Sequence, residues 1–338
     1  MTVSLALRDN PRVAESTRKR IRKLAREMEF MPDPNVANAM SALVRGQYAS
    51  AGERLAFLTS DVTENGWRMW LHNVACFEGA RSRAAEYGYE LEPFWLKKFG
   101  TDFRKMSRIL WSRGIEGILI APMGEGLRNF EFDWDRFSVV ELGETMTVPH
   151  FDCARHDHFD GMLLALYSME SLGYRRIGLA MELMLDVRTR HRWYSAYLLW
   201  QSVREYKDMP VLFYGKFDID RISLWMKQNR LDAVISSRNE LCDELREVSF
   251  DVPGDVGVAV LDRPSGGATN LSGINQNVSA IGSAAADMLV NLVRRNVKGV
   301  PSLPSQKICG GIWTEGSTTR RVGPPLEACS LLDRAVVL

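Results

Sequence analysis

Short apolar runs alternate with amphipathic stretches through most of the chain, beginning at about residue 54. Such runs between turn signals indicate buried strands, and apolar residues three or four positions apart indicate helices. The predicted strands are Arg54–Thr59, Glu90–Trp95, Gly117–Ala121, Ser138–Leu142, Arg176–Ala180, Val211–Tyr214, Ala233–Ser236 and Val256–Leu261. The predicted helices cover about residues 68–87, 102–113, 160–172, 190–206, 219–229, 240–247 and 278–296. This alternation predicts parallel sheets with helices on both faces.

The alternation forms two successive sets, one before about residue 150 and one after it. Two sets of similar build predict an α/β protein with two doubly wound parallel-sheet lobes and a cleft between them. At 338 residues, 46% hydrophobic and 25% charged, the chain is long enough for two or three globular domains. A small helical region is expected to precede the two lobes.

That N-terminal region has a pattern of its own. A short helix is predicted over Thr2–Leu7, followed by a polar turn with Pro11 and a longer helix. The apolar face of the longer helix consists of Val13, Ile21, Leu24, Ala25 and Met28. Residues 8–26 hold eight cations against two acids, although the formal net charge of the whole chain is only +1. A local basic helix suits the neutralisation of phosphates, and the alternative interpretation is a solvated surface helix.

Composition and motifs exclude several classes of protein. The chain has no apolar run of about 18 residues, and its basic N-terminus lacks the apolar segment of a signal peptide, so we expect a cytoplasmic protein without a membrane span. Five dispersed cysteines form no Cys-x-x-Cys pair and are expected to be reduced. His156-x-His158 is more typical of a surface loop than of a metal site. No phosphate loop or catalytic constellation is visible, so neither a cofactor nor enzymatic activity is expected.

Several motifs occur in a recognisable order near the N-terminus: Thr2-Val3-Ser4, Ala6-Leu7, Val13–Arg18, Phe30-Met31-Pro32 and Asp33–Met40. Others follow in the core: Gly173–Ile177, Arg192–Tyr197, Val252–Val258, Ile274–Gln276, Trp313 and Glu315–Thr318. Together they resemble the lactose-repressor/galactose-repressor family of bacterial transcription regulators, over about residues 2–320. The resemblance implies a helix-turn-helix headpiece, a hinge helix, and a core similar to periplasmic sugar-binding proteins.

The resemblance also implies roles in DNA binding. Thr2 and Ser4 would hold phosphates at the start of the recognition helix, and Thr17 and Arg18 would contact the DNA backbone. Leu5 and Arg8 would face the major groove. Met40 of the hinge helix would wedge into a minor-groove base step, with Leu43 as the alternative wedge. Met40 could equally be a buried contact between two hinge helices.

The headpiece departs from the family at its start. Thr2 directly follows Met1, so the segment in which the family forms its first helix and turn is missing from this sequence. Either translation begins upstream or this product has lost DNA binding, and we favour the first explanation. The first helix normally covers the apolar side of the recognition helix, so this chain as written is expected to bind operator DNA poorly.

In the core, the resemblance implies three crossings between lobes, which we place near Val148–Asp152, Asn275–Val278 and Ser305–Ile308. The expected domains are a partial headpiece at 1–33, a hinge helix and linker at 34–50, and a C-terminal tail at 321–338. The first lobe would comprise 51–150 with 278–305, and the second 151–277 with 306–320.

Effector-binding residues are assigned by the same resemblance: Asn65, Trp67, Arg192, Phe217, Asp262 and Gln276. Arg192 would offer a planar fork to hydroxyls or a carboxylate, and Asp262 would accept hydroxyl hydrogen bonds. Phe217 would stack on the ligand. Arg192 could instead pair with Asp186 or Glu182, and Trp67 could simply cap its lobe.

Two departures concern the effector. Arg238-Asn239 stands where relatives carry Asn-Asp, and Arg263 replaces a common second acid. The added cations indicate either an anionic ligand or a cleft that no longer binds one. The sequence as a whole predicts a transcription regulator, a repressor, that binds a pseudo-palindromic operator as a homodimer and responds to a small sugar-like effector. The alternative is a small-molecule-binding protein without DNA-binding activity.

Overall fold

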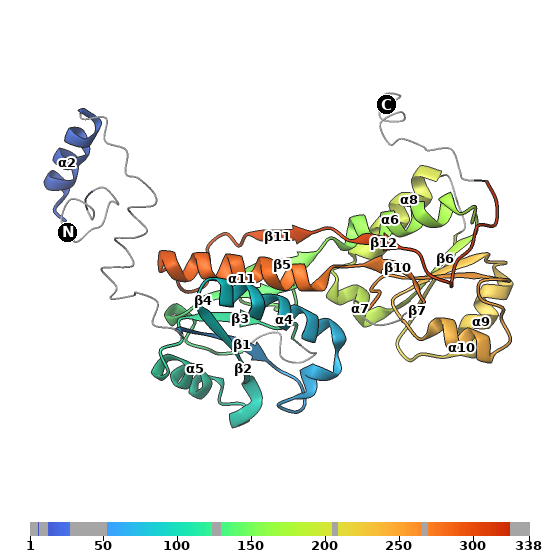
Figure 1. Cartoon of the computed structure of the whole chain (residues 1–338), viewed down its shortest axis with the longest axis horizontal. Helices are drawn as coiled ribbons and strands as arrows, with labels where there is room; N and C mark the ends of the chain where they lie inside the picture. Colours follow the sequence, from blue (N-terminus) through green and yellow to red (C-terminus); the bar gives the residue numbers. More distant parts are fainter. Residues whose placement is uncertain are drawn as a thin grey trace. The chain divides into compact units, whose positions relative to one another are not determined.

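The structure is a computed structural model that describes residue 6 and residues 13–27, 53–123, 130–204, 209–264 and 270–324. The chain divides into two compact units, one up to residue 51 and one from residue 52 onward (Figure 1). No helix in the described ranges is both long and apolar enough to cross a membrane.

The first unit contains the helix α2 (Glu15–Glu27). Lys19, Arg20 and Lys23 are exposed on it, while Val13 is buried just before its start. Leu24, which we predicted on the apolar face, is 55% exposed. Thr17 and Arg18 lie on α2 and are partly exposed. The other predicted DNA-contacting residues, Thr2, Ser4, Leu5, Arg8 and Met40, and the predicted hinge helix lie outside the described residues.

The first lobe of the second unit is built on a six-stranded sheet in the order β11-β5-β4-β3-β1-β2. All of its strand pairs are parallel. The strands are β1 (Glu53–Thr59), β2 (Tyr89–Trp95), β3 (Gly117–Ile120), β4 (Ser138–Leu142), β5 (Asp152–His156) and β11 (Gln306–Cys309). The helices are α4 (Leu71–Glu86), α5 (Phe103–Ser112) and α11 (Val278–Arg295), with short 3-10 turns at Gly66–Met69, Leu96–Phe99 and Trp134–Arg136.

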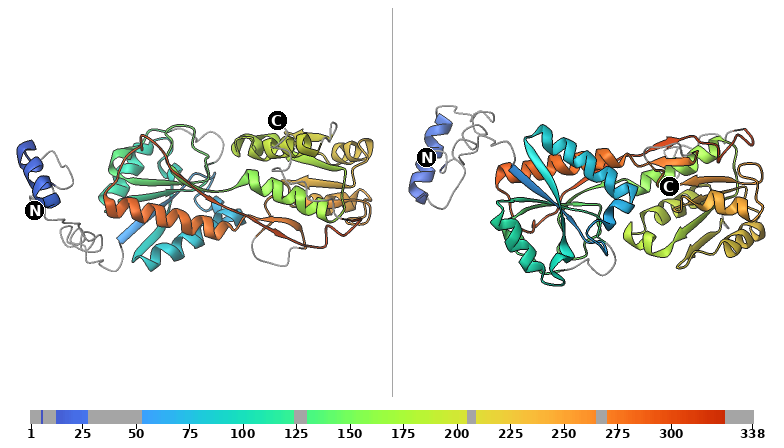
Figure 2. Two further views of the ribbon diagram at one scale, coloured as in Figure 1. Left: turned by 90° about the horizontal axis from the view of Figure 1, so that it is seen from above. Right: turned by 60° about the horizontal axis from the view of Figure 1, so that its bottom comes forward.

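Both faces of this sheet are covered because the side chains of each buried strand alternate between two apolar layers. Leu55 and Phe57 of β1 pack with α4 and α11, whereas Ala56 and Leu58 pack on the opposite side with α5. Figure 2 shows α11 and α5 on opposite faces of the sheet. Gly282 lets α11 lie close against α4, since a Cβ there would stand 2.0 Å from the backbone oxygen of Cys76.

The second lobe repeats this plan with the order β12-β10-β9-β8-β6-β7. Its strands are β6 (Ile177–Glu182), β7 (Val211–Tyr214), β8 (Ala233–Ser236), β9 (Gly257–Val260), β10 (Ser272–Asn275) and β12 (Ile312–Thr314). Its helices are α6 (His158–Ser171), α7 (Leu183–Arg188), α8 (Arg192–Arg204), α9 (Ile219–Gln228) and α10 (Leu241–Glu247). α6 and α8 cover one face, and α9 and α10 cover the other. Only β12, at the edge, runs antiparallel to its neighbour.

The predicted fold class of two doubly wound α/β lobes is confirmed, but two predicted crossings were placed too early. β5 and β11 pair with each other inside the first sheet, so the chain leaves this lobe after His156 and again after Cys309. We had placed these crossings near Val148–Asp152 and Ser305–Ile308. Both strands are short and partly polar, so neither has the apolar run by which the other strands were recognised.

Candidate functional site

Ligands of open parallel α/β sheets bind beyond the carboxyl ends of the strands, where the strand order reverses. In the first lobe the order reverses between β1 and β3, and in the second between β6 and β8. Residues that follow β1 and β4 in the first lobe contact residues that follow β6 and β9 in the second. Two such contacts join the lobes, and together they form the candidate site.

The first contact, here called the His72 contact, joins His72 near the start of α4 to Asp262, which follows β9. His72 Nδ1 lies 3.2 Å from Asp262 Oδ2, and the two side chains are 35% and 34% exposed. Burial alone would lower the pKa of His72, but hydrogen bonds to Asp262 and Cys76 raise it well above its ordinary value of 6.5. The contact therefore favours the charged imidazolium, and we treat it as an ion pair.

The second contact, here called the Glu144 cluster, consists of Glu144, Arg155, Arg190, Arg192 and Gln306. Glu144, which follows β4, has a side chain only 8% exposed. One of its oxygens forms an ion pair with Nη2 of Arg192 and lies 3.3 Å from Nε of Arg155. Its other oxygen accepts a 2.6 Å hydrogen bond from Gln306 Nε2 and lies 3.8 Å from Nε of Arg190. Three guanidinium groups thus surround one carboxylate.

The loop after β4 holds Glu144 in place through a second buried acid. Glu141, at the end of β4, accepts hydrogen bonds from the backbone N–H groups of Thr145 and Met146. Burial raises the pKa of Glu141 to about 7, although these hydrogen bonds act in the opposite direction. Since Thr145 directly follows Glu144, the loop is fixed where Glu144 faces the three arginines.

Arg190 and Arg192 are presented by a strained turn between α7 and α8. Arg190 and His191 have φ angles of +54° and +58°, in the left-handed region that side chains other than glycine rarely adopt. Each such residue costs on the order of 1–3 kcal/mol, which the surroundings must offset. His191 is anchored to the buried Asp186 by a 2.6 Å contact between Nδ1 and Oδ2. We had predicted one helix over 190–206, but the turn delays its start to Arg192.

Arg155 lies behind Glu144 at the crossing from β5 to α6, with a side chain that is also only 8% exposed. Burial and the neighbouring charge of Arg192 lower the pKa of Arg155, while Glu144 opposes this shift. Its Nη1 donates a 3.0 Å hydrogen bond to the carbonyl oxygen of His156. The crossing strand therefore carries a buried positive charge directly into the cluster.

Next to Arg155, the sequence His156-x-His158 lies at the end of β5 and the start of α6, so the predicted surface loop is wrong. Burial lowers the pKa of His156 to about 4 and lowers that of His158 well below 6.5. His156 Nδ1 donates to the carbonyl of Cys309 at 3.2 Å, which ties the two crossing strands together. His158 packs edge-on against Trp193 at 4.9 Å. No group of three or more potential metal ligands occurs among the described residues.

The structure brings three of the predicted effector residues to the interlobe region. Arg192 belongs to the Glu144 cluster and Asp262 to the His72 contact. Gln276 is buried and donates a 2.8 Å hydrogen bond to the carbonyl of Leu261, which positions the residue before Asp262. Arg192 pairs with neither Asp186 nor Glu182, the two partners that we had considered, but with Glu144.

The other three predicted residues have their contacts within one lobe. Trp67 is buried against Phe57 and Phe77, with ring centroids 5.4 and 5.0 Å away, as expected of a residue that caps its lobe. Asn65 is exposed on the loop before it. Phe217 lies beneath the guanidinium of Arg238, at 4.1 Å from the ring centroid, and that arginine is in turn paired with Glu244 at 2.6 Å.

Sequence reasoning missed His72, Glu144, Arg155 and Arg190. Each lies at or beyond the carboxyl end of a strand, Arg155 near the end of β5 and His72 at the start of the helix that follows β1, and this position is the signal that could have found them. Their partners lie far away in the sequence, so no local motif links them.

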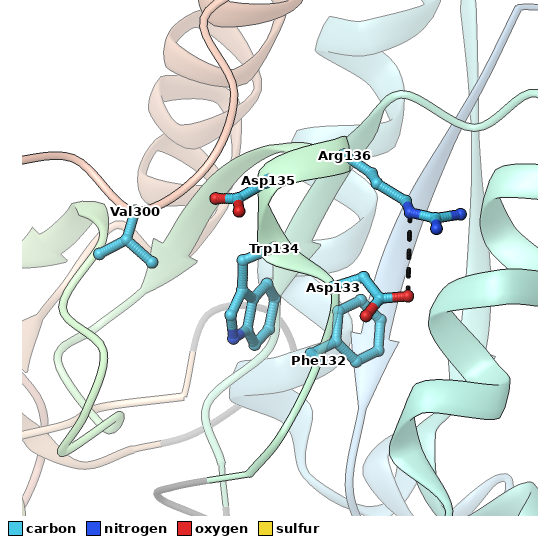
Figure 3. Close-up of a pocket in the computed structure, with 6 residues that line it drawn as sticks. All are labelled: Phe132, Asp133, Trp134, Asp135, Arg136 and Val300. Carbon is cyan, nitrogen blue, oxygen red and sulfur yellow. Dashed lines mark ion pairs between the residues drawn. The ribbon is translucent and has the colours of Figure 1, made fainter.

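A pocket of about 340 Å³ opens beside the Glu144 cluster. It is lined by residues 144–147 and His150 from the first lobe and by Val187, Arg188, Arg190 and His191 from the second. A second pocket of similar volume lies within the first lobe between Phe132, Asp133, Trp134, Asp135, Arg136 and Val300 (Figure 3). There Asp133 already accepts a 3.0 Å hydrogen bond from Ser107 and pairs with Arg136. The interlobe pocket is the stronger candidate, because both lobes line it and it lies beyond the carboxyl ends of the strands.

No family model matches this chain, and no curated protein does. Solved structures do match it. A LacI-family transcriptional regulator from Silicibacter pomeroyi is 20% identical, with 95% of this chain and 96% of that chain covered and a TM-score of 0.55. A LacI-family regulator from Enterococcus faecium with bound ribose is 16% identical, with 80% and 100% covered and a TM-score of 0.54. The transcriptional regulator CelR in complex with cellobiose is also 16% identical, with 94% and 95% covered and a TM-score of 0.55. At these identities the likeness shows a shared fold.

Proposed function

We propose that this protein is a ligand-responsive, DNA-binding transcription regulator of the lactose-repressor/galactose-repressor family and not an enzyme. It acts in the cytoplasm as a repressor and a homodimer, and it binds a pseudo-palindromic operator. A small polar, sugar-like metabolite binds between the lobes. The solved structures of similar fold support this proposal, since they include regulators bound to ribose and to cellobiose.

The observation that carries the proposal is the combination of a basic helix in one unit and a two-lobed α/β body in the other. The second unit supplies a pocket between two lobes, and α2 supplies exposed cations in a separate unit. Phosphate binding needs clustered positive charge, because each contact releases condensed counterions from DNA. A solute-binding protein has no need of such a helix.

The response to the ligand follows from the two interlobe contacts. A ligand that enters the pocket must compete with or reinforce the His72 contact and the Glu144 cluster, and so it favours one arrangement of the lobes. Ligand and DNA are then coupled through the lobe arrangement, by an energy that is typically about 1–3 kcal/mol in allosteric proteins.

DNA binding is tested with the full chain, together with any residues that its gene encodes in frame upstream of Met1, and with genomic fragments selected by it, using fluorescence anisotropy at several salt concentrations. Replacing Lys19, Arg20 and Lys23 of α2 together by Ala is expected to weaken binding by at least tenfold and to lower the salt slope by up to about 3. The matched control replaces Lys98, Arg104 and Arg108, three exposed cations in the first lobe, and should bind normally.

Equal binding by the two triple variants would contradict the assignment of α2 to DNA. A full chain that binds sugars but shows no selective DNA binding would support the alternative function, a small-molecule-binding protein. Sedimentation equilibrium of the same samples tests the dimer.

A further inference from the structure

We propose that the ligand of the interlobe pocket is an anion, and that Arg190 and Arg192 bind its carboxylate or phosphate group in exchange for Glu144. The effector role of this ligand rests on the proposed function, whereas its chemical class follows from the charges around the pocket. The expected ligands are small polyhydroxylated acids or sugar phosphates, and not neutral sugars.

The charges of the Glu144 cluster do not balance. Arg155, Arg190 and Arg192 all lie within 4 Å of the carboxylate of Glu144, which can neutralise only one of them. Asp157 adds a negative charge near Arg155, but its side chain already caps α6 by accepting from the backbone N–H of Asp160. Excess charge in a largely buried place is costly unless a further counter-charge is supplied.

The excess positive charge also acts on Arg155, the most buried of the three arginines. Arg155 is repelled by Arg192, which helps to lower its pKa even with Glu144 beside it. Glu144 also receives a hydrogen bond from Gln306, so four nitrogen atoms lie within 4 Å of its two oxygens. A second anion would reduce the repulsion between Arg155 and Arg192, and it would share the nitrogen atoms around Glu144.

The pocket gives an anion access to Arg190, and from there to the rest of the cluster. Arg190 lines it and is 45% exposed, so its guanidinium can turn to a ligand without being pulled out of a packed core. Arg188 and His150 line the same pocket, and Thr147 adds a hydroxyl. A volume of about 340 Å³ accommodates a six-carbon acid. Arginine suits this purpose because its planar fork matches the geometry of carboxylate and phosphate oxygens.

An exchange of this kind would also move the lobes. Glu144 belongs to the first lobe, whereas Arg190 and Arg192 belong to the second. The carboxylate of Glu144 is part of the first lobe, so its ion pairs with the two arginines hold the lobes together. A ligand anion that replaces it is attached to neither lobe, and it then forms the bridge between them. The chemistry of the ligand and its effect on the lobes are thus determined by the same residues.

Isothermal titration calorimetry on the full chain tests the proposal with matched pairs of probes. The probes are D-galacturonate and D-galactose, D-gluconate and D-glucose, D-glucose 6-phosphate, and inorganic phosphate. At least one anion is expected to bind ten times or more tightly than its neutral parent, and the carboxylate and phosphate probes distinguish the two anionic groups. Tighter binding of the neutral sugars, or no binding of any anion with a Kd below about 10 mM, would overturn the proposal.

Variants assign the binding to the cluster. Arg190→Ala is expected to weaken anion binding by about tenfold or more, and Arg190→Lys by less, because Lys keeps the charge but loses the fork. The control is Arg246→Ala in α10, an arginine of matched exposure (46%) paired with the exposed Asp243. Glu144→Gln removes the internal competitor and should bind the anion more tightly. Equal affinity in Arg190→Ala and Arg246→Ala would refute the assignment.

The outcome is independent of the DNA experiment. Anion binding without selective DNA binding leaves this inference standing and removes the proposed function. Release of bound DNA by a neutral sugar, with no anion bound, would support the proposed function and refute this inference.

Discussion

The two contacts between the lobes join the same two bodies with opposite chemistry. The His72 contact is a single ion pair, about one third exposed, in which the imidazole can lose its charge as the pH rises through its raised pKa. The Glu144 cluster is a network in which arginines, which keep their charge at any physiological pH, surround a carboxylate that is only 8% exposed. The first contact can therefore respond to protons and salt, whereas the second responds mainly to a competing anion.

The largest expected effect comes from removing the centre of the cluster. Glu144→Ala leaves three guanidinium groups without their shared carboxylate, and we expect a loss of about 3 kcal/mol in the free energy of unfolding. Urea unfolding followed by circular dichroism measures it. Glu78→Ala, which removes an exposed partner of Arg81, is the control and should cost no more than about 0.5 kcal/mol. Equal losses in both variants would mean that the cluster is no stronger than a surface pair.

Lowering the pH should destabilise the folded protein at His156, next to the Glu144 cluster, and should leave the His72 contact intact. The pKa of His156 is lowered to about 4 in the folded protein, so the unfolded chain binds a proton first as the pH falls below 6.5. The folded state should lose up to about 3 kcal/mol between pH 6.5 and 4 from this residue. His156→Gln removes the titration and should flatten that part of the stability curve. An unchanged slope in the variant would contradict the prediction.

Raising the pH should weaken the His72 contact and leave the Glu144 cluster unchanged. Because the pKa of His72 is raised in the folded protein, its stabilisation is complete below pH 6.5 and is lost as the pH rises through the raised value. After allowing for solvent screening of these partly exposed groups, we expect at most about 1 kcal/mol. His72→Ala should abolish this dependence, and so should Asp262→Asn. Cys76 and His156 also lie near His72, so Cys76→Ala is measured as a control for thiol titration.

The smallest expected effect is a difference between the two contacts in how their coupling energies depend on salt. Double-mutant cycles measure the coupling energy of His72 with Asp262 and of Glu144 with Arg155, at about 0.05 and 0.5 M salt, concentrations between which the screening length shortens severalfold. The first coupling should fall by a few tenths of a kcal/mol, because its partners are exposed to the solvent. The second should change less, since both side chains are buried. Equal salt sensitivity would remove the distinction between the two contacts.

Much of the fold could be predicted from the sequence because the strands in the middle of each sheet are apolar on both faces. β1, β3, β4, β8 and β9 are short runs of this kind, and their predicted bounds differ from the observed ones by a residue or so. The elements that were misplaced are those whose structure depends on distant partners. β5 is a strand because it lies between β4 and β11, β11 is one because it pairs with β5, and α8 begins at Arg192 because the turn before it is held by Asp186.

The site was predictable only in part. Resemblance led to Arg192 and Asp262, but their partners Glu144 and His72 come from the other lobe, and the sequence alone does not show which loops meet. Trp67 and Phe217 were also assigned by resemblance, yet an aromatic ring at such a position can equally complete the packing of its own lobe. Burial and pairing, and not residue type, decide between these roles.

The three crossings between lobes determine which lobe can be completed first while the chain is being translated. β11 and α11 complete the sheet and the apolar layer of the first lobe, but they are translated only after the whole of the second lobe up to Asn275. At about 5–20 residues per second, β1 through β5 must wait on the order of ten seconds for α11. During that time the surface of α4 that later packs on α11 is uncovered on the ribosome. The second lobe, which then lacks the edge strand β12 and the segment after it that bonds to β9 and β10 through Thr318, can begin to form before the first one is complete.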